Sequence, residues 1–166
     1  MTRLLTPMAT DSRDPRRPRV LPPGVFDAVL ETELKRAVRG QNFVTLVVMD
    51  TRREWDGLML SADEGTLVGL ADVVGREVRD TDPLGHDGKG ALAVLLIDAD
   101  YEHSTRVVDR LVGRIENHEF PMPLHIAIGA ACYPTHAVDA GSLRRQAMAR
   151  PIVNWRGGHG AHAERN

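Results

Sequence analysis

The chain has 166 residues, a formal net charge of −2 and a single cysteine. This length suits one domain with terminal extensions, and the near-neutral charge creates no overall field that would attract nucleic acid or an anionic membrane. No stretch approaches the roughly 20 consecutive apolar residues of a membrane span. The lone Cys132 lies in an apolar run, which is typical of a small buried side chain in a reducing compartment. We therefore expect a cytoplasmic domain with no nucleic-acid or membrane partner.

The two ends of the chain differ in composition from the middle. Residues 1–20 are rich in Pro, Arg and Asp and contain no apolar core of signal-peptide length, and the residues after 158 are polar. Such segments cannot bury enough apolar surface to fold by themselves. We predict a flexible N-terminal leader over residues 1–20, one domain over residues 21–158 and a flexible C-terminal tail over residues 159–166.

The first predicted elements are a helix and a strand. Apolar residues at helical spacing predict a helix over residues 25–40, which Gly40 ends. The run FVTLVVM at 43–49 is rich in β-branched residues and predicts a strand covered on both faces, with Asp50 at its C-terminal end. The charged stretch 51–57 is then expected to be a polar turn.

A second helix and a hairpin follow. The spacing of apolar residues over 64–79 predicts a helix that ends near Arg79. The Asp-Gly pair in DGKG, residues 87–90, has the chemistry of a tight hairpin turn between a short strand near 83–86 and the apolar strand 91–98.

The last predicted elements are a helix over residues 101–118, a strand over residues 123–133, and a short helix over residues 139–150 that Pro151 stops. Helices that alternate with apolar strands, together with one hairpin, indicate an α/β or α+β sandwich with helices on the faces of a sheet. This pattern predicts a fold class and names no function.

Four local sequences in this order resemble those of a known family. They are VTLVVMD ending at Asp50, RDTD at 79–82 with the hairpin after it, LHIAIGAACYP at 124–134, and DAGSLRRQAMA at 139–149. Together they resemble the GGDEF family, the diguanylate cyclase domains that join two GTP molecules into cyclic di-GMP. The resemblance covers residues 21 to about 158. It implies a central, mostly antiparallel sheet flanked by helices, akin to nucleotidyl cyclase and polymerase palm domains.

The family signature itself is altered in this chain. With the family's spacing, its five signature positions fall on Gly88, Lys89, Gly90, Ala91 and Leu92, so that GGDEF has become GKGAL. The resemblance implies that the glutamate of the signature and the aspartate after the first strand hold the divalent ions. Ala91 offers no oxygen, and Asp50 is a lone remnant. We therefore expect no metal site, no cofactor and no catalytic residue.

Other family positions also depart from the pattern. The segment after Asp50 lacks the D-x-D-x-F-K and N-D residues that grip base and phosphate, and the phosphate-binding tyrosine and lysine of the late helix correspond to Ile152 and Trp155. Lys89, in its glycine-flanked turn, could contact a phosphate, or it could be a solvated side chain at a hairpin tip. These departures predict that the chain is not an enzyme.

Arg79 and Asp82 are the predicted ligand-binding residues. They occupy the position of the family's RxxD motif, the inhibitory site that binds cyclic di-GMP, whereas the chain's other RxxD pairs, Arg53 with Asp56 and Arg106 with Asp109, do not. An arginine fork can bind phosphate or guanine, and a carboxylate can accept from guanine N1 and N2. His86 stands where the family often has a further arginine. The alternative is a surface ion pair without a ligand.

Three functions remain open at this stage. The first is a non-catalytic GGDEF-like signalling domain that binds cyclic di-GMP through Arg79 and Asp82, with His86 nearby, and relays its occupancy to a protein partner. The second is a protein-interaction or assembly module, which could be a homodimer and needs no ligand. The third is an active diguanylate cyclase with displaced metal ligands. Binding of cyclic di-GMP to the wild type and to Arg79→Ala distinguishes the first two.

Overall fold

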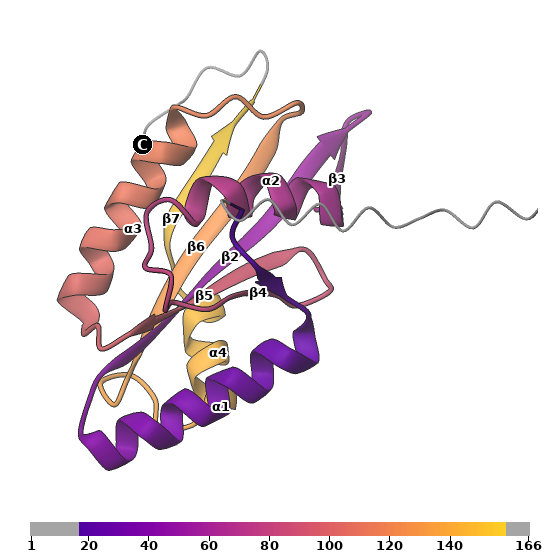
Figure 1. Cartoon of the computed structure of the whole chain (residues 1–166). Helices are drawn as coiled ribbons and strands as arrows, with labels where there is room; N and C mark the ends of the chain where they lie inside the picture. Colours follow the sequence, from indigo (N-terminus) through magenta and orange to yellow (C-terminus); the bar gives the residue numbers. More distant parts are fainter. Residues whose placement is uncertain (1–16, 159–166) are drawn as a thin grey trace, which may run out of the picture.

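The computed structural model describes residues 17–158, which form seven strands and four helices around one sheet (Figure 1). The strands are β1 (Val20–Leu21), β2 (Val44–Trp55), β3 (Leu58–Ser61), β4 (Leu84–His86), β5 (Ala91–Ile97), β6 (Leu124–Tyr133) and β7 (Pro151–Gly157). The helices are α1 (Pro23–Gly40), α2 (Glu64–Val74), α3 (Tyr101–Glu116) and α4 (Ala140–Ala149).

The sheet is antiparallel except at one edge, which confirms the predicted fold class. Its strand order is β1-β4-β5-β2-β6-β7, and only the β1–β4 pair is parallel. Strand β2 is central and pairs with both β5 and β6. Strand β5 leaves β2 at the pair Asp50–Ala91, and β3 pairs with β2 beyond that point, from Arg52 to Trp55.

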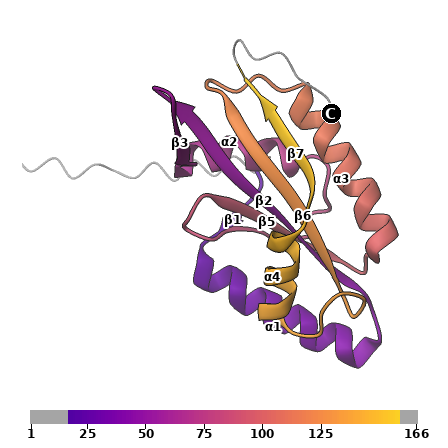
Figure 2. The ribbon, with the colours of Figure 1, turned by 180° about the vertical axis from the view of Figure 1, so that it is seen from behind.

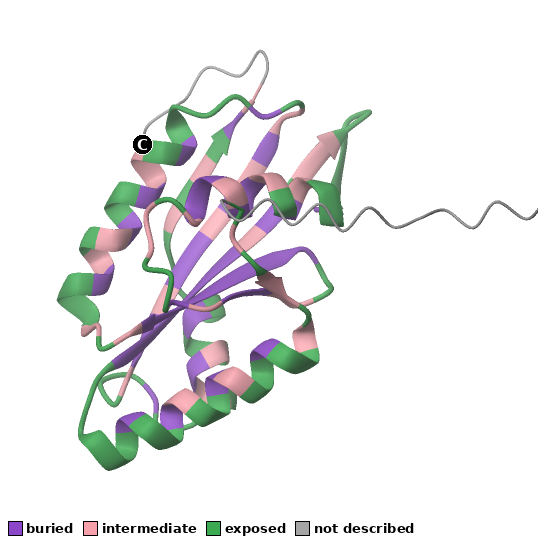
Figure 3. Ribbon diagram, in the orientation of Figure 1, coloured by how far each residue is buried: buried purple, intermediate pink, exposed green. Residues whose placement is uncertain are grey.

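Helices cover the two faces of the sheet in pairs. Figure 1 shows α2 and α3 on one face, and Figure 2, from behind, shows α1 and α4 on the other. Alternation along β2 sends Val47 and Met49 to the core under α2 and α3, whereas Leu46 and Val48 face α1 and α4. Strand β5 is buried along nearly its whole length, as the purple ribbon in Figure 3 shows. The expectation of strands covered on both faces is confirmed.

An aspartate caps the N-terminus of each of three helices. Asp63, Asp100 and Asp139 accept backbone N–H bonds from the residues three positions later, Thr66, His103 and Ser142. The hydroxyl of Thr66, and after it the backbone N–H of the same residue, lowers the pKa of Asp63. The backbone N–H groups of His103 and Ser142, followed by their side chains, lower the pKa values of Asp100 and Asp139, because hydrogen bonds favour the ionised carboxylate. The three aspartates thus fix where α2, α3 and α4 begin.

Several predicted boundaries are wrong. Strand β2 continues past Asp50 to Trp55, so that Asp50 lies within the strand and residues 51–55 are not a turn. The turn is Asp56–Gly57, both with positive φ, and it leads into β3, which was not predicted. Charged residues in this part of β2 obscured the strand pattern. Helix α2 ends at Val74 rather than near Arg79, with Gly75, a residue of low helix propensity, as its C-cap.

The ends of the domain also differ from the predicted ones. Val20, expected in the leader, pairs with Leu84, so β1 begins before residue 21. Residues 1–16 and the predicted tail 159–166 lie outside the described residues. Helix α1 includes Gly40, and its left-handed cap is Gln41. Between residues 17 and 158, no helix is both long and apolar enough to cross a bilayer.

Candidate functional site

The segment Arg79–Asp82 is a closed turn between α2 and β4. The backbone N–H of Asp82 donates to the carbonyl of Arg79 at 2.9 Å, and the backbone N–H of Arg79 donates to Asp82 Oδ2 at 3.1 Å. Asp82 Oδ1 accepts from the backbone N–H of Ile97 at 3.0 Å, which ties the turn to the end of β5. Asp82 is only 8% exposed. Both of its oxygens therefore hold the backbone, and the carboxylate positions Arg79.

Arg79 lines a cavity of about 320 Å³ between this turn and α3. Helix α3 contributes His103, Arg106 and Arg110, and the turn after β5 contributes the exposed Asp98. The guanidinium of Arg79 makes no hydrogen bond or ion pair within residues 17–158. It is therefore available to a ligand.

The arginines of α3 are partly engaged. Arg106 pairs with Glu102 at 2.7 Å, and Arg110 pairs with Glu77 at 3.6 Å. Their side chains are 66% and 55% exposed, and each guanidinium carries five donors, so donors remain for an anion. Three arginines thus border one cavity, with Asp98 as an exposed acceptor beside them. This combination suits a ligand that carries both phosphate and a base with N–H donors.

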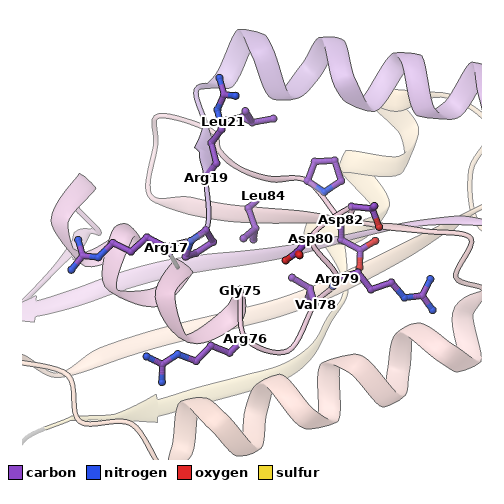
Figure 4. Close-up of a pocket in the computed structure, with 13 residues that line it drawn as sticks. Arg17, Arg19, Leu21, Gly75, Arg76, Val78, Arg79, Asp80, Asp82 and Leu84 are labelled. Carbon is purple, nitrogen blue, oxygen red and sulfur yellow. The ribbon is translucent and has the colours of Figure 1, made fainter. Parts of the chain in front are cut away.

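A second cavity, of about 370 Å³, lies on the other side of the turn and is lined by Arg17, Arg19, Arg76 and Arg79. Figure 4 shows Arg17 and Arg76 extending to one side, Arg79 to the opposite side and Arg19 in a third direction. The four guanidinium groups therefore do not converge on one point of this cavity. Arg76 borders this cavity and not the one beside α3, which allows the two to be tested separately.

The structure does not bring His86 to Arg79 and Asp82. His86 lies on β4 and borders a different cavity, with Arg17, Glu64 and Asp72. Its Nδ1 accepts the backbone N–H of Gly88 at 3.2 Å, so the ring supports the β4–β5 turn. His86 is therefore placed outside the cavity that Arg79 shares with α3.

The altered signature forms the β4–β5 hairpin, as predicted. Asp87 Oδ1 accepts the backbone N–H groups of Lys89 and Ala91 at 2.7 and 2.9 Å, and this closes the turn. A side chain on Gly90 would meet Ser61 and Ala62 at 3.1 Å. Lys89 is exposed, and Leu92 is buried in the core under α2 and α3. Turn geometry therefore accounts for this sequence.

The register places side by side the two positions that the family resemblance assigned to metal ligands. Asp50 on β2 lies directly opposite Ala91 on β5, and both point to the face of α1 and α4. Ala91 is 3% exposed and supplies only a methyl group. The charge paired with Asp50 is Arg52, at 3.9 Å, and the described residues contain no cluster of three His, Cys, Asp or Glu suited to a metal. These residues do not fit the divalent ions of the family.

The remaining family positions are also placed differently from the expectation. Ile152 and Trp155 lie on strand β7 rather than in the late helix, because α4 ends at Ala149 and the chain enters the sheet at Pro151. The segment after Asp50 continues as the β2–β3 hairpin rather than as a polar turn.

Sequence reasoning missed the residues that face Arg79 across the cavity. Arg106 and Arg110 lie about 30 residues further along the chain, four apart on one side of α3. Their i, i+4 spacing marks a common helix face. The sequence carries no local signal that this face lies beside the Arg79–Asp82 turn.

Comparison with known proteins shows similarity to solved structures of one fold. No protein-family model matches the chain, and no curated protein matches it. Among solved structures, a DGC protein from Thermotoga maritima matches 84% of this chain and 100% of its own with a TM-score of 0.69 and 18% identity. The FimX GGDEF domain from Pseudomonas aeruginosa matches 83% of this chain and 90% of its own, with a TM-score of 0.65 and 20% identity.

A third similar structure is the GGDEF domain of DgcB from Caulobacter crescentus, in complex with c-di-GMP. It matches 78% of this chain and 80% of its own with a TM-score of 0.61 and 14% identity. At these identities the likeness concerns the backbone, and it agrees with the sheet order and helix placement described above. The chain therefore has the fold of GGDEF domains.

Proposed function

We propose that this chain is a non-catalytic GGDEF-like signalling domain that binds cyclic di-GMP at Arg79, in the cavity between the Arg79–Asp82 turn and α3. The observation that carries this proposal is the guanidinium of Arg79, which has no partner among residues 17–158 and is held by a closed turn opposite the two arginines of α3. The GGDEF fold of the chain supports the choice of ligand.

The chemistry of the cavity suits a guanine dinucleotide. Arg79 can bind a phosphate with two N–H donors or the Hoogsteen edge of guanine, and Arg106 and Arg110 add positive charge from the opposite wall. Asp98 is an exposed carboxylate that can accept from guanine N1 and N2. Asp82 contributes by holding the turn, since its oxygens already accept two backbone N–H groups.

The lack of turnover is part of the proposal. Joining two GTP molecules needs divalent ions at the position of Asp50, and its neighbour Ala91 supplies no ligand. We expect no product when the purified chain is incubated with GTP and either Mg²⁺ or Mn²⁺ and analysed by chromatography. Stoichiometric conversion of GTP would refute this part of the proposal.

Calorimetry on matched variants tests the binding site. Titration with cyclic di-GMP should give heat for the wild type, and Arg79→Ala should weaken binding at least about tenfold, because a charge-assisted bond is lost. Arg106→Ala, in the α3 cavity only, should weaken it as well. Arg76→Ala and His86→Ala should leave the affinity within about twofold, because their side chains lie in other cavities. The absence of heat at saturating cyclic di-GMP would refute the proposal.

A second function, a protein-interaction module that needs no ligand, is favoured by a different observation. The β2–β3 hairpin exposes large apolar side chains, with Trp55 62% and Leu58 61% exposed. Under this alternative, oligomeric state and partner capture are unchanged by cyclic di-GMP and by Arg79→Ala. The two functions thus differ in their response to one ligand and one variant.

A further inference from the structure

Strand β3 is an exposed apolar edge of the sheet. All four of its residues are exposed, and the hairpin presents Trp55, Leu58, Met59 and Leu60 to solvent, with exposures from 36% to 62%. Figure 3 shows β3 in green at the end of the sheet, in contrast to the buried β5. Within the described residues β3 pairs only with β2. Exposed apolar edges of this kind are sites where another strand adds.

The hydrogen-bond pattern identifies which backbone groups are free. The N–H of Ala62 donates to the carbonyl of Thr51 at 3.0 Å, so this pair is hydrogen-bonded across the hairpin. Hydrogen-bonded and non-bonded pairs alternate along an antiparallel ladder. The backbone N–H and C=O groups of Met59 and Ser61 therefore point outward, away from β2. An incoming antiparallel strand would find two donors and two acceptors.

The side chains of the edge alternate between the two faces of the sheet. Leu58 and Leu60 lie on the same face as their cross-strand partners Trp55 and Arg53, whereas Met59 shares the opposite face with Glu54. The face with Leu58, Leu60 and Trp55 is the more apolar one. An incoming segment with apolar residues at alternate positions would cover this face, because alternate residues of a strand share one face.

Charge disfavours a second copy of the same strand. In the two-fold register that uses both outward residues, Met59 pairs with Ser61 of the other copy, and the Asp56 turn of each copy is directed toward Glu64 at the start of the other copy's α2. This register brings like charges together just beyond both ends of the paired strands, which is unfavourable. Neither Asp56 nor Glu64 makes an ion pair within the described part of the chain. A segment with a basic residue near each end would neutralise both.

We propose that the free edge of β3 takes an extended segment of a partner protein as an additional antiparallel strand, apolar at alternate positions and basic at both ends. The edge lies apart from the cavity at Arg79, and the proposal is independent of cyclic di-GMP. The proposal places the protein-interaction surface of the chain at the β3 edge and specifies the kind of segment that binds there.

A pair of synthetic peptides tests this proposal by fluorescence anisotropy. The first probe is fluorescein-labelled Lys-Val-Thr-Val-Thr-Val-Lys, and the second has Glu in place of both Lys. We expect the basic-ended peptide to bind and to slow amide hydrogen exchange at Met59 and Ser61. The acidic-ended peptide should bind at least about tenfold more weakly at low salt, and that difference should shrink as salt is added.

Variants of the edge identify the mode of binding. Met59→Pro removes an outward N–H while it leaves the bonds between β2 and β3 in place, and it should weaken the basic-ended peptide at least about tenfold. Met59→Val keeps the N–H and serves as the matched control, and circular dichroism verifies that both variants are folded. Leu58→Lys, which adds charge without touching the backbone, gives a second test and should also weaken binding.

Four results would overturn the proposal. The first is that the basic-ended peptide does not bind at millimolar concentration, and the second is that wild type and Met59→Pro bind it equally. The third is a dimer in sedimentation that Leu58→Lys abolishes. The fourth is tighter peptide binding after removal of residues 1–16. The third would assign the edge to a second copy of the chain. The fourth would assign it to the chain's own N-terminal segment.

Discussion

Replacement of Asp82 tests whether the carboxylate of this residue stabilises the Arg79–Asp82 turn. Asp82→Ala removes the acceptor of two backbone N–H groups, those of Arg79 and Ile97, at a position that is 8% exposed. Hydrogen bonds to a charged group contribute about 1.5–3 kcal/mol each. Because solvent can reach the Arg79 end of the turn, we expect a total loss of about 3 kcal/mol in the free energy of unfolding.

The expected loss is large enough for simple assays. For a domain of this size, each kcal/mol corresponds to a shift of roughly 2–4 °C in Tm, so Asp82→Ala should lower Tm by about 6–12 °C. Asp82→Asn keeps one acceptor oxygen and should lose about half as much. Urea unfolding followed by circular dichroism gives the free energy directly.

Asp80 provides the matched control for this experiment. It lies in the same turn, is exposed, and accepts no hydrogen bond within the described residues. Asp80→Ala should change the free energy of unfolding by less than about 0.5 kcal/mol. If Asp82→Ala is as stable as Asp80→Ala, the carboxylate does not hold the turn, and its role would have to lie in ligand contact alone.

Two further predictions concern stability. Gly129→Ala should unfold or strongly destabilise the domain, because its Cβ would collide with the carbonyl oxygen of Ala147, whereas Gly113→Ala, with open space around it, should not; thermal melts compare the two. The lowered pKa values of the three capping aspartates mean that their contribution is present above the unfolded pKa of 3.8 and is lost as pH falls through the folded values. Urea midpoints should therefore fall as the pH is lowered below about 4, and replacing the caps Asp63, Asp100 and Asp139 together by Asn should flatten this acid dependence.

The sequence predicted the parts of the fold that local patterns determine. The apolar runs of β2, β5 and β6, the Asp-Gly turn before Ala91, and helix α3 lie where the periodicity placed them. These elements are long or carry a turn with specific chemistry. The family resemblance also predicted a mostly antiparallel sheet flanked by helices, and the structure confirms this prediction.

The missed elements depend on contacts that the sequence does not display. The end of β2 contains Arg52, Arg53 and Glu54, which are compatible with a strand because this part of the sheet extends beyond the helices. The same Asp-Gly signal that identified the β4–β5 turn occurs at Asp56–Gly57 and could have identified this hairpin. The end of α2 was predicted too late because the apolar spacing continues to Val78, although Gly75, where the helix ends, has a low helix propensity.

The candidate site shows the same division between local and long-range information. The pairing of Ala91 with Asp50 joins two strands that the sequence predicted, and the resemblance had already implied that these two positions are neighbours. The wall that faces Arg79 comes from α3, and only the packed structure brings Arg106 and Arg110 there. His86, by contrast, is close in sequence to Arg79 and still lies in another cavity.

The three RxxD pairs of the chain show why the motif alone cannot decide function. Arg53 and Asp56 lie at the end of β2 and in its turn, Arg106 and Asp109 lie on α3, and only the segment from Arg79 closes on itself. In that closed turn the three-residue spacing is explained by one backbone bond and one carboxylate bond between the same two residues. The stability of the turn is therefore sufficient to explain the presence of Asp82. The described fold does not use the guanidinium of Arg79. A substitution of Arg79 thus tests ligand binding without disturbing the turn, whereas a substitution of Asp82 changes both.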